Sequence, residues 1–223
     1  EKLLNNKKII FSELLSNSFG INCIKFITND KESYIAKYYI DKSLDFNAIE
    51  SETQNLMFLN DLNLKFFPKI YSNDKKFIII SYIDHNGIQP DDTRNDLLHA
   101  ITALHSMKNN NYGFEFETQI GGLKQKNNFS DNWVTFYRDY RLGYIFELIN
   151  SNQMMDKSIN IKIEALIKNL ENYIPKKPNA SLLHGDLWAG NILFNDCNFV
   201  GFIDPGSFYG HNELEIAYLR WFD

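Results

Sequence analysis

The sequence predicts an α+β protein of two lobes, a β-rich lobe at residues 1–83 and a larger, mostly helical lobe at residues 84–223. Three observations predict this class. Apolar runs of strand length and a single helical stretch fill the first part, whereas apolar residues at helical spacing dominate the second. In addition, two polar loops follow short apolar runs between residues 181 and 206, which predicts a site at strand ends in the second lobe.

The first lobe is expected to contain a hairpin, a helix and a buried strand. Residues 21–28 and 33–40 are strand-like and are separated by Asn-Asp-Lys-Glu, a composition typical of a tight turn. Residues 46–60 carry apolar side chains at helical spacing. The run Phe-Ile-Ile-Ile at 77–80 predicts a buried strand, and the Ser-Tyr-Ile-Asp that follows predicts a hinge between the lobes.

The second lobe is expected to contain helices at residues 96–106, 133–149 and 159–173. Aromatic residues gather on one face of the second of these helices, and such a stripe is more typical of a core than of a ligand platform. Residues 111–132 form a polar, glycine-containing segment that is too long for an ordinary connection. Segments of this length are usually functional or disordered.

Composition favours a compact cytoplasmic enzyme. Hydrophobic residues make up 44% of the chain and aromatic residues 15%, enough for a sizeable core. The net charge of −5 argues against a nucleic-acid or anionic-membrane partner. No apolar run approaches the roughly 20 residues of a membrane span, and residues 1–20 lack the pattern of a secretory leader. Cys23 and Cys197 are expected to be reduced core residues in strands, and no zinc site is expected.

The strongest chemical signal is a set of polar residues beside two apolar runs. His184, Asp186 and Asn191 have the spacing H-x-D-x-x-x-x-N, and Asp204 follows. Phosphoryl transfer from a nucleotide needs one carboxylate to accept the proton of the attacking hydroxyl. It also needs an amide oxygen and a second carboxylate to hold the metal ion that bridges the phosphates. Each residue alone would be typical of a turn, but the complete spacing favours a kinase-type site.

The first lobe offers residues that would hold the nucleotide. Lys37 lies in an apolar strand, where a lysine is either an edge residue that reaches solvent or the strand lysine that contacts nucleotide phosphates. Glu52 in the following helix is the expected partner of its ammonium, and Glu50 is the alternative. The hinge would present backbone groups to the adenine edge through Ser81, Tyr82 and Ile83.

Three stretches resemble the fructosamine (ketosamine) kinase family, which has a protein-kinase-like fold and is related to aminoglycoside phosphotransferases and choline kinases. His-Gly-Asp-Leu-Trp-Ala-Gly-Asn at 184–191 matches the family pattern HGDLWxGN, whose tryptophan separates the family from its relatives. Asp-Pro-Gly-Ser-Phe-Tyr-Gly-His-Asn-Glu at 204–213 resembles DPAxxYGxxE. Much of residues 112–142 resembles the family's stretch between the lobes, which explains the long segment. In the first lobe the resemblance rests on Lys37, Glu52 and the order of elements.

The resemblance implies an enzyme that uses ATP and magnesium to phosphorylate the 3-hydroxyl of a ketoamine such as fructosamine or ribulosamine. The phosphorylated adduct decomposes and frees the amine. Asp186 would then be the catalytic base, Asn191 and Asp204 would bind magnesium, and Lys37 with its partner Glu52 would hold the phosphates. The implied pocket for a small ketoamine or a glycated protein includes Trp188, Gln125, Asn127, His211 and Glu213.

Three further residues are expected to be structural. His184 is expected to support the catalytic loop rather than to do chemistry. Arg138 and Arg141 lie near one face of a predicted helix, and a structural salt bridge is favoured for them over a phosphate clamp.

The chain departs from the family pattern in three respects. The loop that covers the phosphates, at residues 16–22, has Gly20 as its single glycine, although Asn tolerates the same backbone. Ser81 stands where an acidic residue is common. The family also continues for several helices beyond the region that matches residues 214–223. We therefore expect either a piece of a longer protein or an abbreviated second lobe.

Two alternative functions remain open at this point. The acceptor could be another small amine-bearing alcohol, such as an aminoglycoside or a choline-like compound, which a strongly acidic pocket would favour. The acidic pair at residues 91–92 is expected to be a solvated turn instead. The chain could also be a non-catalytic nucleotide-binding regulator. The joint presence of the four polar residues of the kinase pattern argues against this second alternative, and they are Lys37, Asp186, Asn191 and Asp204.

Overall fold

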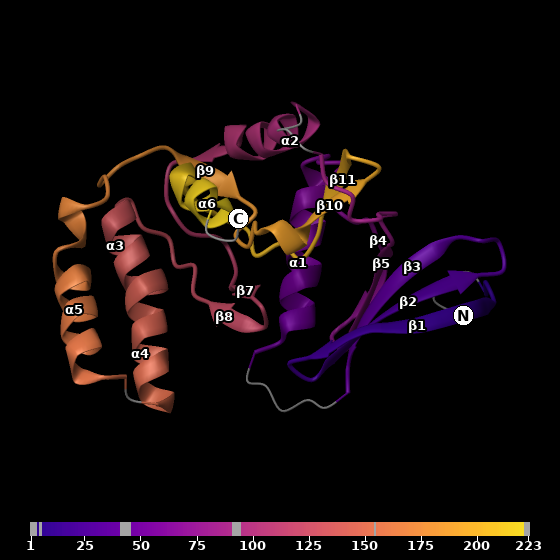
Figure 1. The fold of residues 1–223 in the computed structure, drawn as a ribbon, viewed down its shortest axis with the longest axis horizontal. Helices are drawn as coiled ribbons and strands as arrows, with labels where there is room; N and C mark the ends of the chain where they lie inside the picture. Colours follow the sequence, from indigo (N-terminus) through magenta and orange to yellow (C-terminus); the bar gives the residue numbers. More distant parts are fainter. Residues whose placement is uncertain (1–3, 5, 41–45, 91–94, 154, 221–223) are drawn as a thin grey trace.

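The computed structural model describes residues 4, 6–40, 46–90, 95–153 and 155–220. A twisted β-sheet lies at one end of the molecule and helices lie at the other, with α1 and several short strands between them (Figure 1). The sheet is antiparallel with the order β1-β2-β3-β5-β4. Its strands are β1 (Ile9–Ser18), β2 (Ile21–Thr28), β3 (Ser33–Tyr39), β4 (Ile70–Asp74) and β5 (Phe77–Ser81).

The predicted hairpin is confirmed as β2 and β3, but the strand before it was missed. Residues 16–22 were expected to form a loop, whereas β1 continues to Ser18 and pairs along the whole of β2. Only Phe19 and Gly20 form the turn, with φ values of 51° and 72°. Positive φ at both central residues is the backbone of a type I′ hairpin turn. A tight turn therefore stands where a glycine-rich loop was expected.

Helix α1 (Ala48–Asp61) confirms the predicted helix and carries a buried polar face as well as an apolar one. The side chain of Asn47 caps it by accepting the backbone N–H of Glu50 at 3.1 Å. Ile49 and Leu56 are fully buried, and Glu52 is 4% exposed on the same helix. The cap and the apolar face thus fix a carboxylate inside the molecule.

The second lobe contains short strands at the predicted apolar runs. The buried strand β9 (Ala180–Leu183) lies between β12 (Phe208–His211) and β6 (Lys108–Asn109), and β10 (Ile192–Asn195) pairs with β11 (Asn198–Phe202). Cys197 lies in the turn between β10 and β11 rather than in a strand, and both cysteines are half-buried. The polar loops that follow β9 and β11 therefore begin at fixed strand ends.

The predicted helices are present with two differences. Helix α2 (Asn95–Ser106) agrees with the prediction, and residues 91–92 lie outside the described residues. The predicted helix at 133–149 consists of α3 (Trp133–Tyr137), a π-helical turn at Arg138–Leu142 and α4 (Gly143–Asn152). The third begins earlier, as α5 (Lys157–Lys168), and is followed by a 3₁₀ turn and later by α6 (Asn212–Leu219). Among the described residues, no helix has both the length and the apolar character needed to cross a membrane.

One hydrophobic core joins the two halves of the chain. Ile49 and Ile78 from the first half belong to the same buried cluster as Leu104, Leu182 and Phe202 from the second. The aromatic stripe contributes Trp133 and Phe136 to this cluster, as expected for core residues, whereas α4 and α5 bury none of their residues. The division into two lobes near residue 83 remains a prediction.

The long segment before α3 is an ordered hairpin. Its strands are β7 (Thr118–Ile120) and β8 (Leu123–Gln125), joined by two glycines. Tyr112 and Ser130 exchange backbone hydrogen bonds at the base of the segment, and Gly113 pairs with Tyr209 of β12. The segment is therefore tied to the central strands.

Arg141 anchors this hairpin from within the π-helical turn. Its guanidinium donates to the Asn127 side chain at 2.7 Å and to the Lys126 carbonyl at 2.8 Å. It also lies 4.0 Å from the Phe208 ring centroid. Within the described part of the chain it contacts no carboxylate, so the expected salt bridge is wrong for this residue. Arg138, by contrast, is partly exposed and pairs with Asp139 at 2.7 Å.

We expect the Arg141→Ala variant to lose about 2–5 kcal/mol of unfolding free energy, because it leaves a cavity and removes the partner of the buried Asn127 amide. Arg138→Ala on the same helical stretch is the matched control and should change stability by less than about 0.5–1 kcal/mol, because its ion pair is exposed. Urea unfolding of both variants measures the difference. Equal losses would contradict the anchoring role.

Candidate active site

Lys37 lies at the centre of the charged site. It stands in β3 opposite Cys23 of β2, and its ammonium is 2.6 Å from Glu52 Oε1 and 2.5 Å from Asp204 Oδ1. Glu52 is therefore the partner of Lys37, and the alternative, Glu50, instead lies at the capped end of α1. Burial alone would lower the pKa of Lys37, but the two carboxylates raise it above its ordinary value. Lys37 is accordingly a fixed cation inside the protein.

The loop after β9 holds Asp186 and Asn191 together. The Asn191 amide nitrogen donates to the Asp186 carbonyl at 2.8 Å and lies 3.3 Å from Asp186 Oδ2. Both side chains are buried. Burial raises the pKa of the Asp186 carboxyl to about 6, against a smaller lowering by the Tyr218 hydroxyl. Asp186 is thus a carboxylate with more basic character than an exposed aspartate.

His184 supports this loop through both ring nitrogens. Burial lowers the pKa of His184, so the imidazole is neutral near pH 7. Nε2 lies 3.0 Å from the Ile203 carbonyl, which can only accept, and Nδ1 accepts the backbone N–H of Asp186 at 3.2 Å. The ring therefore ties the Asp186 loop to the residue before Asp204, which agrees with the structural part expected for it.

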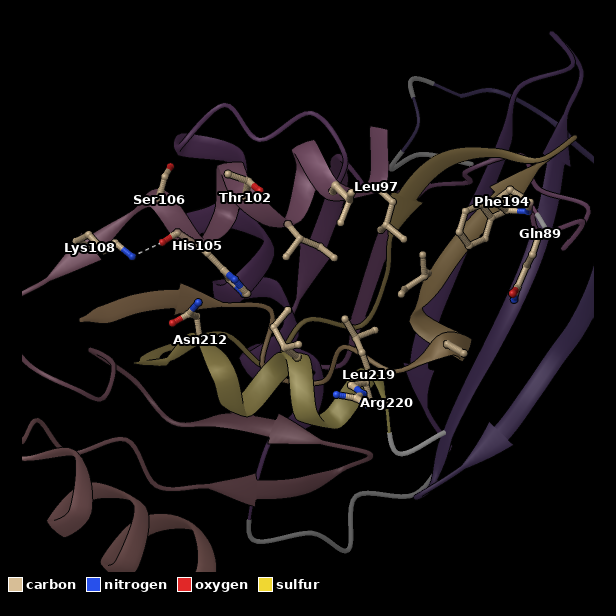
Figure 2. A pocket seen from close by; sticks show the side chains of 16 residues that line it. Gln89, Leu97, Thr102, His105, Ser106, Lys108, Phe194, Asn212, Leu219 and Arg220 are labelled. Atoms are coloured by element: carbon tan, nitrogen blue, oxygen red, sulfur yellow. Dashed lines mark hydrogen bonds between the residues drawn. The ribbon is translucent and has the colours of Figure 1, made fainter. Parts of the chain in front are cut away.

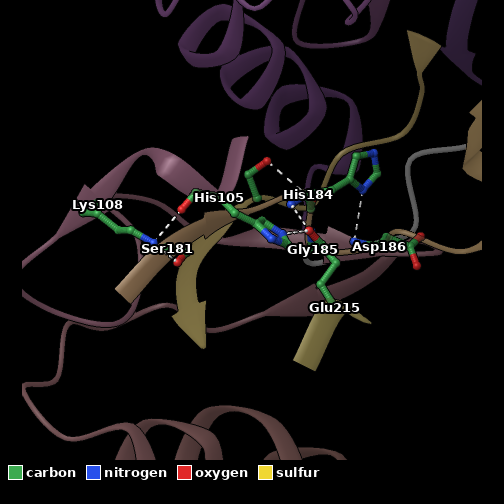
Figure 3. A network of polar contacts seen from close by, with 8 residues as sticks. His105, Lys108, Ser181, His184, Gly185, Asp186 and Glu215 are labelled. Carbon is green, nitrogen blue, oxygen red and sulfur yellow. Dashed lines mark hydrogen bonds and ion pairs between the residues drawn. The ribbon is translucent and has the colours of Figure 1, made fainter. Parts of the chain in front are cut away.

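Glu215 on α6 was not predicted, and it holds the same loop through its backbone. Its carboxylate accepts the backbone N–H groups of His184 at 3.1 Å and Gly185 at 2.8 Å, and it lies 2.7 Å from His105 Nε2 of α2 (Figure 3). Glu215 is 3% exposed. Glu215 lies two residues beyond the predicted Glu213, on a stretch to which no helix had been assigned.

The loop after β9 and the loop after β11 approach each other so closely that two of their residues adopt a left-handed backbone conformation. Gly185 has a φ of 87°, and a Cβ there would lie only 2.0 Å from the Gly206 carbonyl oxygen. Asp204 also has a left-handed backbone, with φ of 55°. Aspartate tolerates this conformation better than most residues, although at some cost. The strained backbone turns the Asp204 carboxylate toward Lys37.

These residues surround a cavity of about 260 Å³. It contains six of the predicted site residues together with side chains from the β1–β2 turn and the β7–β8 hairpin. Sequence reasoning did not identify Gln119 or the contact between Gly122 and Phe19, where a Cβ would lie 2.7 Å from the ring. The predicted residues that line the cavity are Lys37, Glu52, Asp186, Trp188, Asn191 and Asp204.

Four residues expected in the substrate pocket do not line this cavity. His211 pairs with Ala180, at the end of β9 remote from the catalytic loop, and Glu213 follows it on α6. Asn127 is buried and bonded to Arg141 and to Thr118 Oγ1. Gln125 is likewise buried in the hairpin. These four residues therefore lie outside the cavity around Lys37, and their contact with an acceptor stays a prediction.

The predicted nucleotide contacts at the hinge also lie outside this cavity. Ser81 ends β5 and exchanges bonds with Lys69, Tyr82 donates its N–H to the Ser33 carbonyl, and Ile83 lies near Gly201. Gly20 is absent from the lining residues, although its turn neighbour Phe19 is among them. The cavity therefore contains the charged residues predicted for catalysis and for metal and phosphate binding, and the contacts of the hinge with adenine stay a prediction.

A larger hollow of about 920 Å³ adjoins the loop that carries Asp186 and lies between α2, α6 and β10 (Figure 2). It shares no lining residue with the smaller cavity. Its Lys108 ammonium is already bonded to the His105 carbonyl and to Ser181 Oγ, both at 2.6 Å. Size alone thus does not identify the reactive site, which is defined by the grouped charges around Lys37.

Comparison with solved structures identifies the fold. A structure from Thermobifida fusca described as a fructosamine-3-kinase superposes with a TM-score of 0.81 at 19% identity, covering 98% of this chain and 76% of that one. Choline kinase from Cryptosporidium parvum gives a TM-score of 0.66 at 17% identity, covering 98% of this chain and 64% of that one. The predicted protein-kinase-like fold is confirmed.

Comparison of sequences identifies the family. A protein-ribulosamine 3-kinase of Arabidopsis thaliana, described as chloroplastic, is 34% identical over 151 residues. The match covers 65% of this chain but only 44% of that protein, so the chain spans less than half of this relative. The model of the fructosamine kinase family matches residues 16–223. This chain belongs to the fructosamine kinase family.

Proposed function

We propose that this protein is an ATP-dependent kinase that phosphorylates a ketoamine, at O3 of the sugar, and so promotes release of the amine. The grouping of Lys37, Glu52, Asp186, Asn191 and Asp204 around one cavity carries the proposal. It is the residue set that phosphoryl transfer needs, in a chain of the fructosamine kinase family. The names of the relatives, a ribulosamine 3-kinase and a ketoamine kinase of Enterococcus faecium, support the ketoamine as acceptor.

The charge of the cavity supports magnesium as the metal. The described residues that line the cavity carry three carboxylates, on Glu52, Asp186 and Asp204, against the single ammonium of Lys37, an excess of two negative charges once Asp186 is ionised. Mg²⁺ is commonly held by one or two protein oxygens together with substrate phosphates. Asp204 would supply a carboxylate oxygen. Asn191 would supply its amide oxygen, because its nitrogen already donates to Asp186. The bound ion would neutralise charge on the phosphates.

Asp186 would act on the acceptor hydroxyl. Its pKa near 6 leaves it mostly ionised at neutral pH while keeping it basic enough to accept a proton. Lys37, held by Glu52, would contact the phosphates and keep them oriented. In a loose phosphoryl-transfer transition state most of the acceleration comes from such positioning and charge neutralisation.

Trp188 and the β7–β8 hairpin would form the acceptor side. The indole is 39% exposed and lines the cavity beside Asp186. An aromatic face offers apolar contact to a sugar ring or to the alkyl chain of a glycated lysine. Gln119 and Gly121, at the tip of the hairpin, lie across the same cavity. This arrangement suits an extended adduct with one polar sugar end.

The direct test is a magnesium-dependent ATP-consumption assay with ribuloselysine, fructoselysine and a panel of aminoglycosides and choline. We expect turnover of a ketoamine, and a loss of about 10²- to 10⁴-fold in kcat for Asp186→Ala because the base is removed. Asp131→Ala, which removes an exposed carboxylate outside the cavity, is the matched control and should keep full activity.

Turnover of an aminoglycoside or choline without turnover of any ketoamine would reject the proposed acceptor and keep the reaction class. Binding of ATP without turnover of any acceptor would reject the proposal that the protein is an enzyme and would favour a non-catalytic nucleotide-binding regulator.

The raised pKa of Asp186 predicts that the ionised carboxylate, which the reaction would need, lowers the free energy of unfolding. The pKa of its carboxyl is about 6 in the folded protein against an ordinary value of 3.8, so folding free energy is lost as the pH rises from about 4 to about 6 and the loss stays constant above that. Asp186→Asn should therefore be more stable than the wild type at pH 8, by on the order of 2 kcal/mol, and the difference should shrink toward pH 4.

Urea unfolding across this pH range measures the effect, and kcat/KM of the wild type should fall as the pH drops below about 6. A stability difference that does not depend on pH would show that the raised pKa is not its cause.

A further inference from the structure

We propose that Tyr218 is a positioning residue that holds the Asp186 carboxylate in its reactive orientation. The Tyr218 hydroxyl lies 3.2 Å from Asp186 Oδ1 and is the donor, since an ionised carboxylate can only accept. The second oxygen, Oδ2, faces the Asn191 amide nitrogen at 3.3 Å. Contacts to both oxygens fix the plane of the carboxylate, which a contact to one oxygen would leave free to rotate.

Helix α6 is built to hold the catalytic loop at two points. Glu215 and Tyr218 are three positions apart, so they lie on the same face of the helix. Glu215 binds the backbone N–H groups of His184 and Gly185, and Tyr218 binds the side chain of the next residue, Asp186. The two contacts of α6 therefore orient both the backbone and the carboxylate of the loop.

Tyr218 reaches Asp186 from outside the reactive cavity. The residues that line the cavity include Asp186, Asn191 and Trp188, but not Tyr218. A phenol that occupied the place of the acceptor hydroxyl would be part of that lining. The contact is therefore compatible with a bound acceptor and does not block the carboxylate. The orientation matters because small misplacements of a catalytic group lower rates strongly.

Tyr218→Phe tests the inference, with Tyr112→Phe as the matched control. Tyr112 also donates its hydroxyl, to the Pro178 carbonyl at 2.5 Å, but it does so outside the cavity. With the acceptor that the wild type uses, we expect Tyr218→Phe to lower kcat by about tenfold while the KM values for ATP and acceptor stay unchanged. Tyr112→Phe should keep the wild-type kcat even where it lowers the urea midpoint of unfolding.

An unfolding cycle at a fixed pH of about 8 supplies a readout that does not need activity. Tyr218→Phe should lower the urea midpoint more in the wild type than in Asp186→Ala, where this acceptor is gone. Equal effects in both backgrounds, or an unchanged kcat, would overturn the inference. This inference rests on the proposed function for its catalytic consequence. If the wild type turns over no acceptor, that function fails, and the cycle alone still decides whether Tyr218 holds Asp186.

Discussion

The ion cluster around Lys37 is the interaction on which the rest of the structure depends. One ammonium joins strand β3, helix α1 and the loop after β11, because it contacts both Glu52 and Asp204. The desolvation of buried charges is expensive, and it is offset only when partners are held in good geometry. The capped helix α1 and the close contact of the two glycine-containing loops provide that geometry. Loss of the Lys37 ammonium would leave two carboxylates without their cation between the two halves of the chain.

The loop at residues 184–191 is held by its surroundings rather than by its own conformation. His184 ties it to the chain before Asp204, and Glu215 takes two of its backbone N–H groups. These contacts fix the loop, so that Asp186 stays buried and its pKa stays raised. Burying the ionised Asp186 carboxylate lowers the free energy of unfolding, and a loss of stability of this kind is common where a site needs a basic group. The β7–β8 hairpin, anchored by Arg141, completes the cavity from the other side.

Much of the fold could be predicted, and each failure has a physical reason. The hairpin β2–β3 and helix α1 follow from local periodicity and turn composition. Strand β1 was missed because all of its residues are exposed and its apolar residues do not alternate, so pairing with β2 defines it. The helix at 133–149 contains a π-helical turn that its apolar spacing does not reveal. The hairpin in residues 111–132 depends on long-range contacts to Tyr209 and Arg141.

The sequence by itself determined which chemical groups the site would contain. Asp186, Asn191 and Asp204 have a recognisable spacing, and they lie in turns next to short strands that form locally. Tertiary structure alone decided which groups meet. It paired Lys37 with Glu52 rather than Glu50. It also brought Gln119 to the cavity, and Glu215 and Tyr218 to the loop that carries Asp186, which their sequence positions did not indicate. It also placed His211 at the far end of β9. The reason is that chain direction, register and burial set side-chain contacts across long sequence separations, and no local pattern carries that information.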